Sequence, residues 1–276
     1  MRIVKSTRNI VFWIVLLLVV AATLYPFLVM ISGSLKTDFE MNNYPLRLIV
    51  RDPVVIHYEA LFTVIPFLRQ FFNSMFVAFA SASLAIFISA LVAFGFSRYE
   101  FRAKKLLFLL ILGTMLIPGP VLLVPQFQMY LAMGLFGTYV PLILPAGINA
   151  FGIFLIRQVM SQIPYELYES AMMDGCSDVR SFFTIAIPLS KAGLGIVGIL
   201  AFMGSWNDFF TPLLYLQGEE TFTLPLGLVR LQNFYAISYG ASLAGAFVSC
   251  IPIILLLTIV GQKYFVSGFM AGAIKG

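Results

Sequence analysis

The sequence predicts an all-α integral membrane protein with six transmembrane helices and a helix-turn-helix loop on the cytoplasmic side. Of its 276 residues, 61% are hydrophobic and only 11% are charged, whereas soluble domains contain about 45–50% apolar and about 25% charged residues. The apolar residues form runs long enough to cross a hydrocarbon layer of about 30 Å. Alternating segments typical of a membrane barrel are absent from the sequence, and a helix satisfies its own backbone groups inside lipid. We therefore expect helical spans.

Six apolar runs qualify as spans, at about 10–31, 70–97, 106–126, 139–160, 191–214 and 239–262. The first run follows Arg2, Lys5 and Arg8 and resembles a secretory signal peptide. It is longer than the apolar region of such peptides, about 7–15 residues, and has no clear small-x-small cleavage site before Pro26. We therefore expect it to be retained as the first span of a single domain that covers residues 1–276.

The spans contain small residues and prolines at informative positions. Gly240 and Ala244, like Ala241 and Gly245, lie four residues apart, and such pairs let helices approach closely in lipid. This pattern predicts a helix bundle. The prolines expected to kink or interrupt spans are Pro26, Pro118, Pro125, Pro141, Pro145, Pro212 and Pro252.

The 17 basic residues are unevenly divided between the two sides of the six-span arrangement. Most lie before the first span, in the 98–105 turn, in or beside the 161–190 loop, or after the last span. The other side has only Lys36, Arg47, Arg51, Arg69 and Arg230. Since cytoplasmic loops carry the excess of Lys and Arg, we expect a multi-pass protein of the inner (plasma) membrane with both termini in the cytoplasm. The formal charge of +5 thus indicates membrane orientation and no nucleic-acid partner.

Few side chains suggest a chemical site. We interpret the single histidine, His57, as a polar loop residue, because no second nitrogen ligand lies near it in the sequence. Cys176 and Cys250 are interpreted as free thiols. We expect no metal site and no catalytic residue, because the sequence offers no ligand cluster and no nucleophile–base pair. It also lacks a phosphate loop of the Gly-x4-Gly-Lys-Ser/Thr type, so we expect no nucleotide site of this kind in the chain.

The 161–190 loop is too polar to span a membrane and too regularly patterned to be a linker. Pro164 suits the first turn of a helix. Ile163, Leu167 and Ala171 follow at four-residue spacing and form an apolar stripe. Gly175 can end this helix in a left-handed conformation.

A second short helix is expected after this glycine. Ser177 or Asp178 can cap it, and its apolar face is formed by Phe182, Phe183 and Ile187. An apolar helix held outside the membrane by a sharp turn has the shape needed to enter a groove of a partner protein. From composition alone, an amphipathic hairpin lying on the lipid headgroups is an equal alternative.

This loop resembles the inner-membrane permeases of ABC importers. Their cytoplasmic signature is Glu-Ala-Ala, three residues, Gly after Asp, then Phe and Leu-Pro at set distances. The corresponding residues here are Glu169, Ser170, Ala171, Asp174, Gly175, Phe182, Pro188 and Leu189. Ser170 stands where alanine is usual, which is a small and helix-compatible change.

Three further stretches resemble the carbohydrate branch of this family, the maltose-transporter type. They are 206–210 (WNDFF) with Pro212 and Leu213, 223–227 (TLPLG), and the tail from 262 to 276. The resemblance covers almost the whole chain from the second span onward, while the part before it matches only in general character. It implies a type I importer transmembrane domain that translocates a sugar or oligosaccharide.

The resemblance also implies several partners. They are a second homologous permease, two cytoplasmic ATPase subunits that use ATP and Mg, an extracytoplasmic sugar-binding protein, and membrane lipid. Closure of the ATPases around ATP would move the loop and switch the bundle between inward-facing and outward-facing states.

The residues implied in ATPase coupling are Glu169, Ala171, Asp174, Gly175, Phe182 and Pro188. Gly175 would permit the turn, Asp174 would fix its polar contacts, and Glu169 would hold the hairpin or meet the ATPase. In the tail, Lys275 and Gly276 are candidate ATPase contacts, and a disordered end is the alternative.

Asp208 lies within or beside the fifth span, where an ionisable residue is costly and is a functional candidate by default. Trp206 could stack on a sugar ring, and Asn207 and Asp208 could accept its hydroxyl hydrogens. These three residues are candidates for the translocation path. The alternative is that they organise a bend in the helix.

Other function classes remain as alternatives. An ion-coupled secondary transporter needs buried charged relays, and Asp208 and Arg157 are nearly the only candidates. A membrane scaffold and an ABC permease for a non-sugar solute are further possibilities. The 161–190 loop favours an ATP-driven importer, since an ion-driven carrier has no use for a docking helix.

Overall fold

The computed structural model describes residues 2–45, 47–234 and 239–262, and within these ranges the chain forms helices and turns without β-strands. The chain divides into two compact units. The first contains Met1–Leu68 and Gly227–Ile251, and the second contains Arg69–Leu226 and Pro252–Gly276. One domain over the whole chain stays a prediction.

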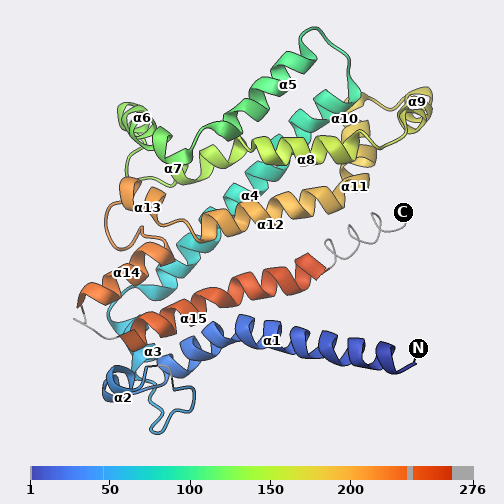
Figure 1. Ribbon diagram of the computed structural model, residues 1–276. Coiled ribbons are helices and arrows are strands. Elements are labelled where there is room, and N and C mark those ends of the chain that lie inside the picture. Colours follow the sequence, from blue (N-terminus) through green and yellow to red (C-terminus); the bar gives the residue numbers. More distant parts are fainter. Residues whose placement is uncertain (1, 46, 235–238, 263–276) are drawn as a thin grey trace. The chain divides into compact units, whose positions relative to one another are not determined.

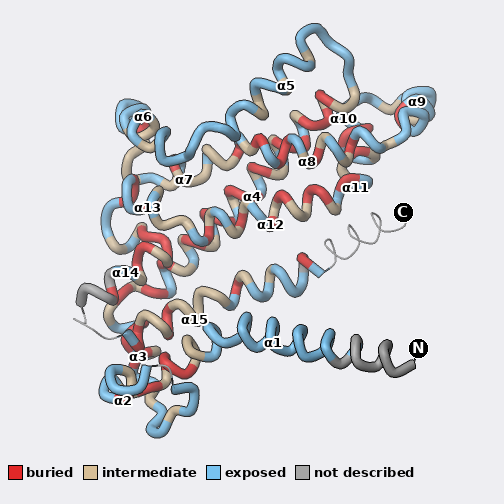
Figure 2. Tube along the Cα trace, in the orientation of Figure 1, coloured by how far each residue is buried: buried red, intermediate tan, exposed pale blue. Residues whose placement is uncertain are grey.

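The first unit contains one long helix and several short ones (Figure 1). Its helices are α1 (Arg2–Ser34), α2 (Asp38–Asn43), α3 (Ile56–Thr63), most of α14 (Leu224–Phe234) and most of α15 (Tyr239–Leu256). Apolar side chains such as Phe12 and Trp13 are exposed along α1, which Figure 2 shows in pale blue. A helix that is apolar on all sides and uncovered is suited to lipid or to a partner subunit.

The segment after α1 is built around buried polar groups. Lys36 is fully buried, and its Nζ donates hydrogen bonds of 2.9 Å to the carbonyl oxygens of Tyr44 and Pro45. The ring of His57 lies 2.8 Å from the carbonyl oxygen of Lys36. The prediction of His57 as a polar loop residue is wrong, because it lies in α3 and only 3% of its surface is exposed.

The second unit contains the remaining helices. Before residue 161 they are α4 (Phe67–Arg98), α5 (Lys104–Gly113), η1 (Thr114–Leu116), α6 (Gly119–Ala132), α7 (Val140–Ile143), η2 (Leu144–Gly147) and α8 (Ala150–Met160). After these follow α9 (Tyr165–Met173), α10 (Asp178–Ser181), η3 (Phe182–Ala186), α11 (Ile187–Leu189), α12 (Lys191–Trp206), α13 (Phe210–Tyr215) and η4 (Leu257–Gly261).

Four helices of the described chain are long and apolar enough to cross a membrane, and six spans result if each of two bent pairs counts as one. The four are Val11–Ser34, Phe67–Arg98, Val140–Met160 and Tyr239–Ile259. The bent pairs are Lys104–Leu116 with Gly119–Ala132, at 99°, and Asp178–Leu189 with Lys191–Trp206, at 79°. The described chain is thus a multi-helix bundle of the predicted class.

Two predicted spans are interrupted. The third, expected as one helix over 106–126, breaks at Pro118, whose backbone is extended with ψ of 127°. A proline has no N–H to donate and disfavours a helical residue before it, which explains the break. In the fifth, expected over 191–214, α12 ends at Trp206 and α13 begins only at Phe210.

The helices α4, α8 and α12 share one core in the second unit (Figures 1 and 2). Its buried members include Phe94 from α4, Ile156 from α8 and Val197 from α12. Gly152 allows the close approach, because a Cβ at this position would lie 2.7 Å from Ser89 Oγ and 3.0 Å from the Val197 side chain. This core supports the hairpin described next.

Candidate functional site

Residues 165–181 form a helix, a glycine turn and a second helix, as the sequence predicts. Gly175 has φ of +78°, and its N–H donates to the carbonyl of Met172 at 3.0 Å. The N–H of Cys176 donates to the carbonyl of Ala171 at 2.9 Å. These two bonds form a Schellman motif, in which glycine is preferred because it has no Cβ. The turn therefore has a sharply defined geometry.

The second half of the hairpin differs from the predicted single helix. Ser177 caps α10, and its Oγ accepts a hydrogen bond of 3.3 Å from the N–H of Arg180. The chain then forms a π-helical segment, η3, before the short α11. The N–H of Ile187 donates to the carbonyl of Phe182, and Pro188 has no N–H to offer. The loss of that donor accounts for the wider hydrogen-bonding pattern.

Two aromatic side chains anchor the hairpin to the core. Tyr168 of α9 and Phe182 of η3 are each 4% exposed. Their ring centres lie 6.1 Å and 5.3 Å from that of Phe94 in α4. Burial raises the pKa of Tyr168. The hairpin is therefore packed against α4 at these contacts.

Arg98 in the last turn of α4 contacts the same helix, α9. Its Cζ lies 4.3 Å from the ring centre of Tyr165 and 5.0 Å from that of Tyr168. Its Nη2 donates to the Sδ of Met172 at 3.1 Å. Cation–π contacts of this kind are favourable at such distances, so Arg98 connects α4 to both ends of α9.

Most of the rest of α9 is exposed. Leu167 is 46% exposed and Met173 is 89% exposed, and no described part of the chain covers them. Among the predicted coupling residues, Glu169, Asp174, Gly175 and Pro188 are exposed, Ala171 is half-buried, and Phe182 lies in the core. The tail candidates Lys275 and Gly276 lie outside the described residues.

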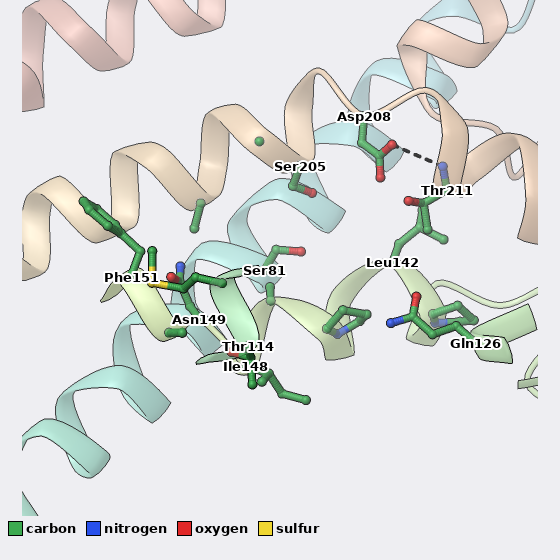
Figure 3. Close-up of a pocket in the computed structure, with 17 residues that line it drawn as sticks. Ser81, Thr114, Gln126, Leu142, Ile148, Asn149, Phe151, Ser205, Asp208 and Thr211 are labelled. Atoms are coloured by element: carbon green, nitrogen blue, oxygen red, sulfur yellow. Dashed lines mark hydrogen bonds between the residues drawn. The ribbon is translucent and has the colours of Figure 1, made fainter. Parts of the chain in front are cut away.

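A second feature of this unit is a polar cavity of about 580 Å³. It lies between the bend after α12 and the region of α7, η2 and α8 (Figure 3). Its polar lining residues are Ser81, Thr114, Gln126, Asn149, Ser205, Asp208 and Thr211. None of the lining residues is basic. Hydroxyl and amide groups around one carboxylate make the cavity suitable for a neutral, hydroxyl-rich ligand.

Asp208 has a structural contact inside this cavity. Its Oδ1 accepts a hydrogen bond of 3.1 Å from the N–H of Thr211, at the start of α13 (Figure 3). Ser81 also lines the cavity; it is 1% exposed, and its Oγ has no hydrogen-bond partner within the described chain. A buried hydroxyl without a partner is unfavourable, so Ser81 is available to a bound ligand.

Trp206 and Asn207 are placed differently. Trp206 is 2% exposed, and its ring stacks on Phe202 at 5.8 Å and meets Phe71 edge-on at 5.6 Å. Asn207 is exposed and donates from Nδ2 to the carbonyl of Met203 at 2.9 Å. Neither residue lines the cavity, so of the three candidates the structure brings only Asp208 to it.

Sequence reasoning missed several residues of both sites. From the sequence, Arg98 adds only to the positive charge of the 98–105 turn. Ser81 and Asn149 come from α4 and the start of α8, far from Asp208 in the sequence. A polar residue inside an apolar run is a signal that could have indicated Ser81. No local signal could have paired Arg98 with Tyr165, because their contact depends on the tertiary fold.

Comparison with known proteins gives a consistent result. The family described as "Binding-protein-dependent transport system inner membrane component" matches residues 85–265. The arabinooligosaccharides transport system permease protein AraQ of Bacillus subtilis (strain 168) is 34% identical over 257 residues, which cover 92% of this chain and 91% of AraQ.

Solved structures show the same fold. One is a bacterial ABC transporter involved in the import of the acidic polysaccharide alginate, with a TM-score of 0.81 and 23% identity over 95% of this chain and 97% of the other. Another is a bacterial alginate ABC transporter in complex with its pentasaccharide-bound periplasmic protein, with a TM-score of 0.65 and 17% identity over 95% of this chain and 96% of the other.

Proposed function

Because the chain belongs to the family of binding-protein-dependent transport system inner membrane components, we propose that it is the permease of an ATP-driven importer for a sugar or oligosaccharide. Members of this family are non-enzymatic membrane subunits, and ATP is hydrolysed by a separate subunit. Membership in this family argues against the alternative that the chain is an ion-coupled secondary transporter.

The cargo proposal rests on the relatives and on the polar cavity. AraQ belongs to an arabinooligosaccharide transport system, and the cavity at Asp208 offers hydroxyls, amides and one carboxylate without a basic group among its lining residues. Such a lining can bond sugar hydroxyls and would repel an anionic solute. We place Asp208 on the translocation path and assign Trp206 and Asn207 to the bend beside it.

The single observation that carries the coupling proposal is the exposed α9, anchored by Tyr168 and closed by Gly175. We propose that α9 enters a cleft of a cytoplasmic ATPase, one of two that use ATP and Mg. Glu169, Ala171 and Asp174 would contact it. The proposal includes two further partners, a second homologous permease and an extracytoplasmic sugar-binding protein. In the tail, we propose that Lys275 and Gly276 contact the ATPase.

Site-directed cross-linking tests the docking. In a background with Cys176→Ser and Cys250→Ser, we expect Met173→Cys to cross-link to the ATPase subunit. Leu116 in η1, which directly follows α5, is 85% exposed. Leu116→Cys is the matched control and should not react with the ATPase subunit. Equal cross-linking at both positions, or none at position 173, would contradict the proposal.

Uptake tests the cargo separately. A strain that lacks this chain should lose uptake of a labelled neutral oligosaccharide and regain it with the native sequence. Uptake of an amino acid instead would leave the importer assignment intact and replace the sugar by a non-sugar solute, the second candidate that the family allows.

A further inference from the structure

A cavity of about 700 Å³ lies where the turn after α4 meets the end of α8. Three basic residues line it: Lys104 and Lys105 in the first turn of α5, and Arg157 in the last turn of α8. The other lining residues are Glu100 and apolar side chains. Neither the hairpin nor the polar cavity at Asp208 uses these cations.

The charges in this cavity do not cancel. Glu100 is the one carboxylate among the lining residues, and its Oε1 accepts a hydrogen bond of 2.7 Å from Nζ of Lys104. That bond and the charge of Lys104 lower the pKa of Glu100, with smaller contributions from Arg157 and Lys105. Glu100 is thus paired with Lys104, which leaves Lys105 and Arg157 as excess positive charge.

Arg157 is held in place with one donor unsatisfied. Its Cζ lies 4.1 Å from the ring centre of Phe108, a cation–π contact that fixes the plane of the guanidinium. Its Nε is buried and has no hydrogen-bond partner in the part of the chain that the structure describes. A buried charged donor without an acceptor is unfavourable, so an anionic ligand at this position would be stabilising.

The position of the cavity restricts the ligand. Lys104 and Lys105 immediately precede the apolar run of α5, and Arg157 lies near the end of the Val140–Met160 span. The cavity therefore opens at a boundary between hydrocarbon and water. Its apolar side includes Leu109, which is 63% exposed. A fitting ligand has negatively charged oxygens at one end and an apolar chain at the other.

We propose that this cavity binds the phosphate of an anionic phospholipid, with Lys105 and Arg157 holding the head group and an acyl chain lying along α5. Charge-assisted hydrogen bonds from Arg and Lys suit phosphate oxygens, and basic pockets between membrane helices are suited to lipid head groups. The bound lipid connects α5 with α8, which leads directly into α9. Lipid binding at this cavity does not depend on which solute the protein transports.

The test uses the transporter purified with its partner subunits in nanodiscs of phosphatidylcholine that contain a minor fraction of phosphatidylglycerol. Native mass spectrometry then counts the lipids retained by the complex. We expect preferential retention of phosphatidylglycerol. The double variant Lys105→Gln/Arg157→Gln should reduce this preference by about 10- to 30-fold, since each basic residue near the membrane surface contributes several-fold.

A matched variant separates the site from general surface charge. Arg102→Gln/Lys191→Gln removes the same charge from two residues that do not line the cavity, Arg102 in the turn before α5 and Lys191 at the start of α12. It should keep the preference. Equal loss in both double variants would overturn the proposal. Displacement of phosphatidylglycerol by millimolar inorganic phosphate would also overturn it, because the site would then take a soluble anion.

Discussion

Arg98 joins a membrane helix to the hairpin through its guanidinium. The contacts with Tyr165 and Tyr168 cover about one turn of α9, and the bond to Met172 reaches the next turn. Since α9 is otherwise anchored mainly through Tyr168, the guanidinium fixes the angle at which α9 leaves the core. A force applied to α9 by a partner would thus reach α4 through Arg98.

Replacement of Arg98 by methionine keeps an unbranched side chain and removes the charge. We expect a loss of about 1–2 kcal/mol in the local stability of α9, from two cation–π contacts. Hydrogen exchange of the α9 amides would measure it, and the number of ATP molecules hydrolysed per sugar imported should rise. Arg102→Met, in the neighbouring turn, should change neither quantity. Unchanged exchange in Arg98→Met would contradict this role.

Asp208 accepts a hydrogen bond at the start of α13 and also brings a negative charge to the cavity. Two substitutions distinguish these two roles. Asp208→Asn keeps an oxygen that can accept from Thr211, whereas Asp208→Ala loses both functions. We expect Asp208→Ala to reduce uptake at saturating binding protein by about tenfold, the size expected for a lost charged hydrogen bond, and Asp208→Asn to have a smaller effect. Equal uptake by all three proteins would remove Asp208 from the path.

For individual residues, the sequence indicates which side chains are candidates for a site, but not which other side chains they contact in the fold. Asp208 stood out because an ionisable residue near a span is costly, and it does line the cavity. Trp206 stood out equally, yet it stacks on Phe202 in the core. Both have the same local sequence context, and only the packing of α4 and α12 around the bend distinguishes them.

The hairpin depends on a glycine whose backbone is left-handed. Proline fixes φ near −65°, which is incompatible with the φ of +78° at Gly175. We therefore expect Gly175→Pro to abolish uptake while the protein remains in the membrane. Uptake and membrane fractionation measure the two outcomes, and normal transport by this variant would contradict the coupling role of α9.

A matched glycine makes the result specific. Gly134 also has a left-handed backbone, with φ of +68°, and at both glycines a Cβ would meet no described atom within 4 Å. Gly175→Ala and Gly134→Ala therefore introduce similar strain, about 1–2 kcal/mol. Only Gly175→Ala should lower the ratio of uptake to ATP hydrolysis.

Elements were predictable where the local rules are strong. The apolar runs, the helix of the hairpin and the glycine turn follow from hydrophobic periodicity and capping. The break at Pro118 agrees with the expectation that prolines interrupt spans, but its angle of 99° does not follow from sequence. The sequence predicts a single α-helix here and not the π-helical segment η3, because a proline such as Pro188 removes one donor without specifying which wider hydrogen bond replaces it.

The distribution of basic residues over the whole chain indicates which loops face the cytoplasm. Residues 98–105, from the end of α4 to the start of α5, include Arg98, Arg102, Lys104 and Lys105, whereas the connection from α6 to α7 contains no charged residue. Such a difference favours the cytoplasm for the first connection. The same charges support α9 on that side, where it could meet an ATPase.

Reporter fusions measure this orientation. Alkaline phosphatase fused after Gly134 should be active, because this enzyme folds only outside the cytoplasm, and a fusion after Gly175 should be inactive. A cytoplasmic reporter such as β-galactosidase should give the opposite pattern. As the control, both fusion sets should be present in the membrane in equal amounts. Active phosphatase after Gly175 would place α9 outside the cell. No cytoplasmic ATPase could then contact α9, and the lipid cavity at Arg157 would belong to the outer leaflet.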